Sequence, residues 1–271
     1  MSPAVDPTPV PVTDPNPDPH RVPVTELERI AALGWRGTTV ERLGGWLLRA
    51  GSGFTGRANS VLPLGDPGLA LPAAIAHAER FYARHGLPVA VQQPDAGPGT
   101  AAADLAAELD RRGWSTSDPV LVLVAPLAQV LDRSPAADVL PPAALAARPD
   151  AAWLSGYLYR GAPLPPTAVD VLLAADRPVF ASLVLDGSLA GVARAVVDEG
   201  WLGITALTVD PGHRRRGLGC HLVGELARWG AAQSARSVYL QVDGGNAAAL
   251  ALYDRLGFRR HHEYRYRRPP G

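Results

Sequence analysis

The most constraining stretch of this 271-residue chain runs from Leu207 to Gly219 and reads Leu-Thr-Val-Asp-Pro-Gly-His-Arg-Arg-Arg-Gly-Leu-Gly. It predicts an apolar strand, a tight turn rich in arginine and glycine, and an amphipathic helix that follows directly. Backbone N–H groups in such a turn form a concave nest, and the helix start adds unsatisfied donors and a positive dipole end. Gly217 and Gly219 lack the Cβ that would keep phosphates away from the main chain. The stretch therefore predicts a site for a diphosphate-bearing ligand.

The overall composition excludes several classes of function. Acidic and basic residues balance at 26 each, so no net charge attracts the chain to nucleic acid or to a membrane. Cys220 is the single cysteine, which excludes a disulfide framework, and no Cys/His spacing suggests a metal site. No segment is long and apolar enough to cross a bilayer, and the first residues lack the pattern of a secretory signal. We expect a cytoplasmic protein without a metal.

Composition also predicts four parts along the chain. Residues 1–24 are rich in proline and are expected to be disordered, because they cannot bury enough apolar surface to offset their ordering entropy. A docking segment is the alternative for this tail. Residues 25–131 and 150–271 carry alternating helix and strand patterns, which predicts two α/β domains. The Pro/Ala-rich segment 132–149 is the predicted linker.

Periodicity and turn residues predict the elements within these domains. Thr25 and Glu28 have the spacing of a capping box, with Leu27, Ile30 and Ala31 on one face of the helix that would follow. Further helices are predicted at 72–85, 101–112, 150–158, 166–174, 219–232 and 247–256. Strands are predicted at 45–49, 58–62, 89–92, 120–124, 179–185, 189–197, 201–209 and 238–242, with a hairpin turn at Asp186-Gly187 and a helix cap at Asn246.

Two strand–helix units in the chain resemble each other. The second unit ends in Asp-Arg-x-Gly-aromatic at 254–258, and the first ends in the same pattern at 110–114. Chance similarity is the simpler alternative. If the repeat is real, the first copy has Gly-Asp-Pro-Gly at 65–68 in place of the arginine–glycine turn, and Leu109 in place of Tyr253. The first copy would then lack both the anion nest and a phenol.

From about residue 150 to its end, the chain resembles the GCN5-related N-acetyltransferase (GNAT) family. The resemblance rests on Val209, on the Arg-x-x-Gly-x-Gly turn that begins at Arg214, and on the later block from Asn246 through Tyr253 to Phe258. The presence of two halves is similar to tandem actinobacterial members of the family. The resemblance implies an α/β (α+β) fold, in which a mixed, mostly antiparallel sheet is flanked by helices and occurs in two tandem copies. The first copy would be degenerate and the second catalytic.

The resemblance implies acetyl-CoA as co-substrate. Its diphosphate would lie on the amides of Arg215 through Cys220, and its pantetheine arm along the edge of the strand, where a bulge is expected. A backbone N–H near Leu207 or Thr208 would face the thioester carbonyl. The implied binding residues are Leu207, Thr208, Val209, Arg214, Arg215, Arg216, Gly217, Leu218, Gly219, Cys220 and Asn246.

Each of these residues also has a simpler explanation. Arg214 and Arg216 would serve equally as solvated loop charges, and Cys220 as a small residue at the helix start rather than a nucleophile. Asn246 needs no function beyond capping a helix. A Rossmann-type dinucleotide site is the rival interpretation of Gly217-Leu218-Gly219, but Leu222 stands where the third glycine belongs and a hairpin precedes the turn.

Tyr253 is the candidate catalytic residue. The resemblance places its phenol beside the thioester, where it would return a proton to the CoA sulfur, and a core tyrosine is the alternative. Trp153, Tyr157 and Tyr159 are candidate acceptor-binding residues, and core packing is again the alternative. Arg57 and Asn59 of the first half are candidates from the other side of the acceptor.

No general base is evident in the sequence. Asp198, Glu199 and Asp243 lie near predicted strand ends, where solvation of a turn explains each of them. The basic stretch 259–268 does not by itself predict nucleic-acid binding, because the exposed face of a last strand accounts for it.

The expected function is transfer of acetyl from acetyl-CoA to a primary amine by direct attack in a ternary complex. The acceptor is expected to be a small-molecule or peptide amine, with no nucleic acid and no membrane as partner, and a homodimer stays open. Alternatives are a non-catalytic acyl-CoA-binding or scaffolding module and a transferase for a longer acyl group.

Overall fold

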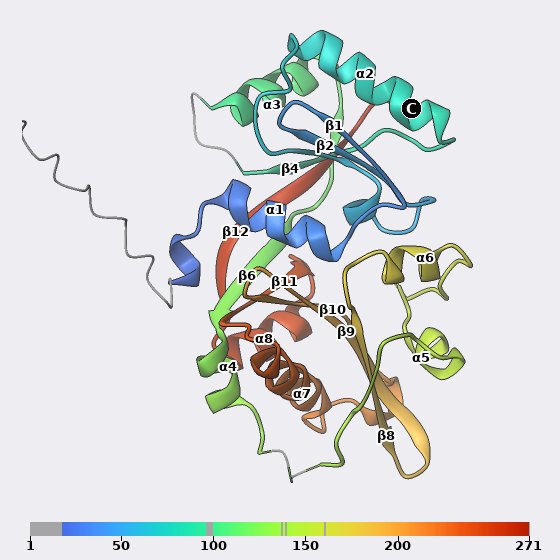
Figure 1. Cartoon of the computed structure of the whole chain (residues 1–271), viewed down its shortest axis with the longest axis vertical. Coiled ribbons are helices and arrows are strands. Elements are labelled where there is room, and N and C mark those ends of the chain that lie inside the picture. Colours follow the sequence, from blue (N-terminus) through green and yellow to red (C-terminus); the bar gives the residue numbers. More distant parts are fainter. Residues whose placement is uncertain (1–17, 96–99, 137, 139, 160, 271) are drawn as a thin grey trace, which may run out of the picture.

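The computed structural model describes residues 18–95, 100–136, 138, 140–159 and 161–270. Within them, twelve strands form one mixed sheet in the order β1-β2-β3-β4-β12-β6-β11-β10-β9-β8-β7, and β5 pairs with β12 (Figure 1). Most neighbouring strands are antiparallel, and the pairs β3–β4 and β10–β11 are parallel. The predicted fold class, a mostly antiparallel sheet flanked by helices, is confirmed.

The strands are β1 Thr39–Leu43, β2 Trp46–Ala50, β3 Val61–Pro63, β4 Val91–Pro94, β5 Ser115–Thr116, β6 Val120–Pro126, β7 Ala144–Ala146, β8 Val179–Leu185, β9 Ser188–Asp198, β10 Trp201–Val209, β11 Ser237–Asp243 and β12 Arg259–Arg268. The helices are α1 Val24–Gly34, α2 Leu71–Arg84, α3 Ala101–Arg111, α4 Leu127–Arg133, α5 Ala151–Gly156, α6 Ala168–Leu173, α7 Leu218–Ala232 and α8 Ala247–Arg255. Short 3-10 helices are η1 Pro19–Arg21, η2 Gly56–Ala58 and η3 Pro211–His213.

Helices cover both faces of the second half of the sheet. Successive side chains of a strand point to opposite faces. On β9, Ala193 packs in the same apolar cluster as Leu222 of α7, whereas Val192 packs with Trp153 of α5 and Val171 of α6. α7 and α8 therefore lie on one face, and α5 and α6 lie on the other, which they share with α1.

The two halves exchange their last strands. β6 comes from the first half, yet it lies between β11 and β12 and pairs with β11 over its whole length. β12 comes from the second half, yet it pairs with β4 of the first. Figure 1 shows both strands running through the middle of the molecule, from one half into the other. Each half therefore needs a strand of the other half to complete its part of the sheet. The domain limits at residues 131 and 150 remain a prediction.

The predicted repeat has a counterpart in the topology. In each half, a parallel strand pair is joined by a helix: α2 joins β3 to β4, and α7 joins β10 to β11. A second helix then ends at a glycine with positive φ, Gly113 at 70° and Gly257 at 90°. The Asp-Gly hairpin turn between β8 and β9 is also present, with Asp186 and Gly187 both at positive φ.

Three local expectations differ from the structure. α1 begins one residue before Thr25, after Pro23, and no side chain caps it. Glu28 is instead buried, and its carboxylate accepts a hydrogen bond from Gln92 of β4 and contacts His262 of β12. Long-range partners for the carboxylate thus replace the predicted capping box.

The other two differences concern segments expected to lack structure. Residues 18–23 do not belong to a disordered tail, because Pro19 is buried in η1 and the carbonyl of Val22 contacts His261 Nε2 at 2.8 Å. Residues 1–17 of that prediction lie outside the described residues. The predicted linker contains β7, which extends the sheet by pairing with β8.

Candidate functional site

A bulge interrupts β10 where the resemblance led us to expect one. The pairing of β10 with β9 shifts register between Thr205 and Thr208, and Ala206 has a φ of 56°. On its other edge, β10 pairs with β11 only as far as Ile204. The edge formed by Thr205 to Val209 is therefore released from β11, and it includes the partly buried Leu207, Thr208 and Val209.

The loop after β10 presents backbone amides. The Asp210 carboxylate accepts a hydrogen bond from Gly212 N at 2.9 Å, and the Arg214 guanidinium donates to the carbonyl of Val209 at 3.3 Å. Arg215 and Gly217 both have positive φ, 60° and 78°, so the backbone alternates in hand around Arg216. Such alternation makes a concave nest of N–H groups. No side chain caps the following helix α7, so its first amides, those of Leu218 to Cys220, remain available.

A cavity of about 440 Å³ opens beside this loop, close to the volume of small-ligand sites. Its lining includes three guanidiniums from three separate segments: Arg133 at the end of α4, Arg215 in the loop, and Arg255 at the end of α8. None of the three forms an ion pair with another described residue. Unpaired positive charge around a cavity next to free backbone amides suits a ligand with several phosphates.

Sequence reasoning missed Arg133 and Arg255. Arg255 belongs to the repeated Asp-Arg-x-Gly ending, and that pattern indicates an internal repeat but not a phosphate contact. Arg133 follows the first half, and nothing in its local sequence connects it with a loop eighty residues later. It reaches the cavity because α4 packs directly against α7.

The remaining loop residues match their simpler explanations. Burial raises the pKa of the Cys220 thiol, which argues against a nucleophile and favours a packing role at the helix start. The Asn246 carboxamide oxygen accepts a hydrogen bond from Ala249 N at 3.1 Å, so the predicted cap of α8 is confirmed. Its predicted contact with the pantetheine stays a prediction.

Tyr253 lies on α8 and is 7% exposed. It packs in one cluster with Leu218 of α7 and Val242 of β11, and its ring is 5.7 Å from that of Phe258. Burial raises the pKa of the phenol to about 12, and its hydroxyl forms no hydrogen bond with a described residue. The phenol is therefore protonated at neutral pH.

The three predicted acceptor residues lie in one apolar cluster, in which the Trp153 and Tyr157 rings are 5.5 Å apart and Tyr159 packs at the margin. Trp153 is 1% exposed, and its indole N–H donates to the carbonyl of Ala193 at 3.1 Å, so it belongs to the core. Tyr157 and Tyr159 stack edge-on, and Tyr159 also meets Phe54 of the first half with ring centroids 5.1 Å apart. The structure thus brings the two tyrosines together with the loop that precedes η2.

Arg57 and Asn59 of the first half occupy that junction. Asn59 accepts hydrogen bonds from the amides of Gly51 and Gly53 and donates to the carbonyls of Phe54 and Thr55, which fixes the loop. It is therefore a positioning residue. The Arg57 guanidinium lies over the ring of Trp35, 5.2 Å from its centre.

The three acids considered as bases separate into two groups. Asp198 and Glu199 lie at the turn before β10, at the opposite end of that strand from the bulge, and Glu199 is paired with Arg29. Asp243 ends β11 on the same side as the bulge, and its carboxylate accepts a hydrogen bond from Gly245 N at 2.9 Å. Among the described residues, no group of three or more His, Cys, Asp and Glu side chains could hold a metal ion.

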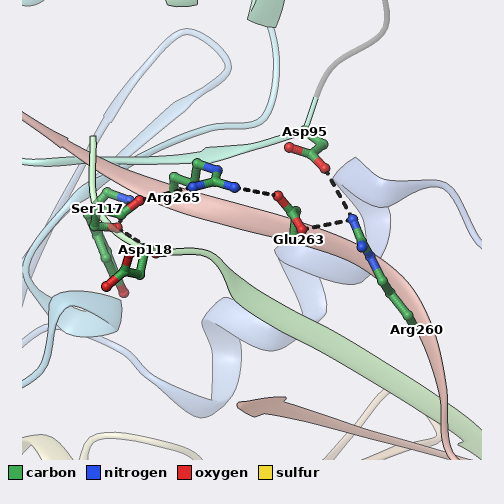
Figure 2. Close-up of polar contacts among 7 residues, drawn as sticks. Asp95, Ser117, Asp118, Arg260, Glu263 and Arg265 are labelled. Carbon is green, nitrogen blue, oxygen red and sulfur yellow. Dashed lines mark hydrogen bonds and ion pairs between the residues drawn. The ribbon is translucent and has the colours of Figure 1, made fainter. Parts of the chain in front are cut away.

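The basic last strand is largely neutralised by acids. Figure 2 shows Glu263 between Arg260 and Arg265, with Asp95 of the first half also contacting Arg260. Arg267 contacts Asp110 of α3 in the same way. These pairs offset much of the positive charge of β12. No helix in the described part of the chain combines the length and apolar character needed to cross a bilayer.

Comparison with known proteins agrees with this geometry. A family model described as "Probable histone acetyltransferase Rv0428c C-terminal" matches residues 23–267. The probable histone acetyltransferase Rv0428c of Mycobacterium tuberculosis is 31% identical over 254 residues, which cover 90% of this chain and 73% of that protein. The uncharacterized N-acetyltransferase YobR of Bacillus subtilis is 28% identical over 253 residues, 90% of this chain and 98% of YobR.

A solved GCN5-related N-acetyltransferase from Kribbella flavida shares the fold, with a TM-score of 0.66 at 15% identity over 91% of this chain and 95% of that one. The bulged strand, the amide-rich loop and the family match therefore agree with one another. This chain belongs to the Rv0428c C-terminal family of GCN5-related N-acetyltransferases, and it is a GNAT-type acyl-CoA N-acyltransferase.

Proposed function

We propose that the protein transfers the acetyl group of acetyl-CoA to a primary amine by direct attack in a ternary complex. The observation that carries this proposal is the adjacency of three features: the released edge of β10, the nest of amides from Arg215 to Cys220, and the cavity lined by three unpaired arginines. The second half, residues 150–271, supplies most of this site, and the predicted linker that follows the degenerate first half supplies Arg133.

The proposed binding mode uses these features in order. The diphosphate lies on the loop amides, and Arg133, Arg215 and Arg255 surround the phosphates of the adenosine end. The pantetheine arm lies along Leu207 to Val209 and forms main-chain hydrogen bonds with the released edge. Arg214 and Arg216 flank the diphosphate. An amide near the bulge then faces the thioester carbonyl and stabilises its oxyanion.

The proposed reaction forms a bond from the amine nitrogen to the carbonyl carbon and breaks the bond from that carbon to sulfur. The amine gives up a proton to solvent, and the thiolate that leaves accepts one. Tyr253 is the proposed donor, because its phenol is protonated and packs in one cluster with Leu218 of α7 and Val242 of β11; the phenolate then regains a proton from solvent.

Tyr253→Phe is the test of this assignment. Since the substitution removes one hydroxyl and no packing, we expect the kcat for CoA thiol release with a panel of amines to fall about 10²-fold or more, with an unchanged KM for acetyl-CoA. Tyr82→Phe is the matched control, because Tyr82 is a buried tyrosine of the first half whose hydroxyl donates to the carbonyl of Arg49. Full activity of Tyr253→Phe would remove the phenol from the mechanism.

A non-catalytic acyl-CoA-binding module is the second candidate. It is favoured by one observation: of the three acids considered as bases, Asp198 and Glu199 lie at the far end of β10 from the bulge, and the Asp243 carboxylate already accepts a hydrogen bond from Gly245 N. Calorimetry separates the two candidates. Binding of acetyl-CoA without thiol release on any amine would support the module, and a series of longer acyl-CoA thioesters would identify a different acyl preference.

A further inference from the structure

A positively charged side chain lies at the junction between the two halves and has no role in the mechanism above. Arg57 belongs to η2, and four tyrosines lie close enough to interact with its guanidinium electrostatically: Tyr157, Tyr159, Tyr264 and Tyr266. With Trp35 they form what we call the Arg57 cluster. The contact between halves is tight here, because a Cβ added at Gly56 would lie 2.6 Å from Cζ of Tyr266.

No negative charge balances Arg57 within the described residues. It forms no ion pair with any described carboxylate. Three of its tyrosine neighbours do not supply an anion, because burial raises the pKa of Tyr157 to about 12 and also raises the pKa of Tyr264 and Tyr266. Burying an unpaired charge is costly, so a partly buried guanidinium among neutral rings favours a bound anion.

Further unpaired hydrogen-bond donors surround the same cluster. Trp35 Nε1 and one Nη of Arg194 are buried and have no hydrogen-bond partner among the described residues. Indole and guanidinium N–H groups donate only, so these two can be satisfied only by an acceptor. A carboxylate offers two oxygens with several acceptor positions and no donor, and it matches this excess of donors.

The cluster adjoins the bulge of β10 on the face opposite the amide nest. Ala206, the bulged residue, packs against the apolar group that contains Trp35 and Tyr157. Arg194 links the two, since its guanidinium lies 5.0 Å from the centre of the Trp35 ring and 3.5 Å from the Thr205 hydroxyl. The Arg57 cluster is therefore in contact with the bulged part of β10.

We infer that Arg57 binds a carboxylate of the acceptor, so that the amine acetylated by this protein belongs to a molecule that also carries a carboxylate group. This inference rests on the proposed function, and it names the class of its acceptor. It also gives the first half a part in substrate selection, because η2 supplies the guanidinium and β12 supplies two of the surrounding tyrosines.

Matched acceptors that differ only in the carboxylate test this inference. We expect the full-length enzyme to acetylate at least one of β-alanine, 4-aminobutyrate and alanylglycine with a kcat/KM at least about 10-fold above that of its amide, as a charged hydrogen bond of about 1.5 kcal/mol or more implies. Arg57→Gln is expected to bring that ratio close to one, and Arg57→Lys to retain part of it. Arg42→Gln, an exposed arginine on β1, is the control whose ratio stays at the wild-type value.

Equal or better turnover of every amide would overturn the inference, and so would an Arg57→Gln variant with the wild-type ratio. A binding measurement separates these failures from failure of the proposed function. If no amine releases thiol, N-acetyl-β-alanine and its amide are titrated into the CoA-bound protein by calorimetry. Tighter binding of the acid that is lost in Arg57→Gln supports the carboxylate site, and equal binding of the two ligands rejects it.

Discussion

Gly217 and Gly219 stand two residues apart in the predicted anion-binding turn, but they have different neighbours. Gly217 has a φ of 78°, and nothing lies within 4 Å of the position of its missing Cβ. A Cβ on Gly219 would lie 2.4 Å from Cδ1 of Leu252. Gly217 therefore suits the left-handed backbone of the loop, whereas Gly219 leaves room for the Leu252 side chain of α8. The sequence pattern predicted one role, close approach of phosphates, for both.

Arg255→Gln and Arg133→Gln test the phosphate cavity. Each removes one guanidinium from a group of three with no other ion-pair partner among the described residues, so we expect the Kd for CoA to rise about 10-fold in each variant. The salt dependence of binding should also weaken, because fewer charges attract the phosphates. Arg80→Gln, an exposed arginine of α2, is the control. Unchanged Kd values by calorimetry would place the phosphates elsewhere.

At the scale of elements, Glu28 of α1 belongs to a chain of buried polar side chains that connects the two halves by hydrogen bonds. Glu28 contacts His262 Nε2 of β12 at 2.8 Å and accepts from Gln92 of β4 at 2.7 Å. Gln92 in turn accepts from Arg49 of β2 at 3.0 Å, and Arg49 donates to Ser60. All five side chains are buried, so each depends on the others for its hydrogen bonds.

Glu28→Ala is expected to lower the free energy of unfolding by about 3 kcal/mol, because it leaves buried partners of the carboxylate unsatisfied. Glu26→Ala on the same helix is the matched control. Its carboxylate is 44% exposed and pairs with Arg29 at the surface, so we expect a loss below about 1 kcal/mol. Urea unfolding measures both values. Equal losses for the two variants would show that the buried chain adds no stability.

Local signals predicted some elements well and others poorly. The β8–β9 hairpin follows from two β-rich runs around Asp186-Gly187, and the start of α8 follows from Asn246, since both depend on neighbouring residues. β1 was missed, because its exposed side chains, Thr39 and Val40 among them, give no apolar alternation. The capping box failed because the partners of Glu28 lie far away in the sequence.

For the whole molecule, the exchange of β6 and β12 makes each half depend on the other. We therefore expect a single cooperative unfolding transition, with the same midpoint whether it is followed by tryptophan fluorescence or by circular dichroism. The tryptophans report on both halves, since Trp46 lies in the core of the first and Trp153 in the core of the second. Two separate transitions would show that the halves fold independently despite the shared strands.

Much of the chemistry of this protein follows from the sequence alone. The proposed role of the strand, turn and helix from Leu207 to Gly219 rests on backbone amides and glycine conformations, which depend on residues adjacent in the chain. The tertiary structure alone placed Arg133 beside Arg255, Arg57 among tyrosines of the other half, and β6 between β11 and β12. These arrangements join residues far apart in the chain, and their energies come from packing and strand pairing, which leave no periodic or local trace in a sequence.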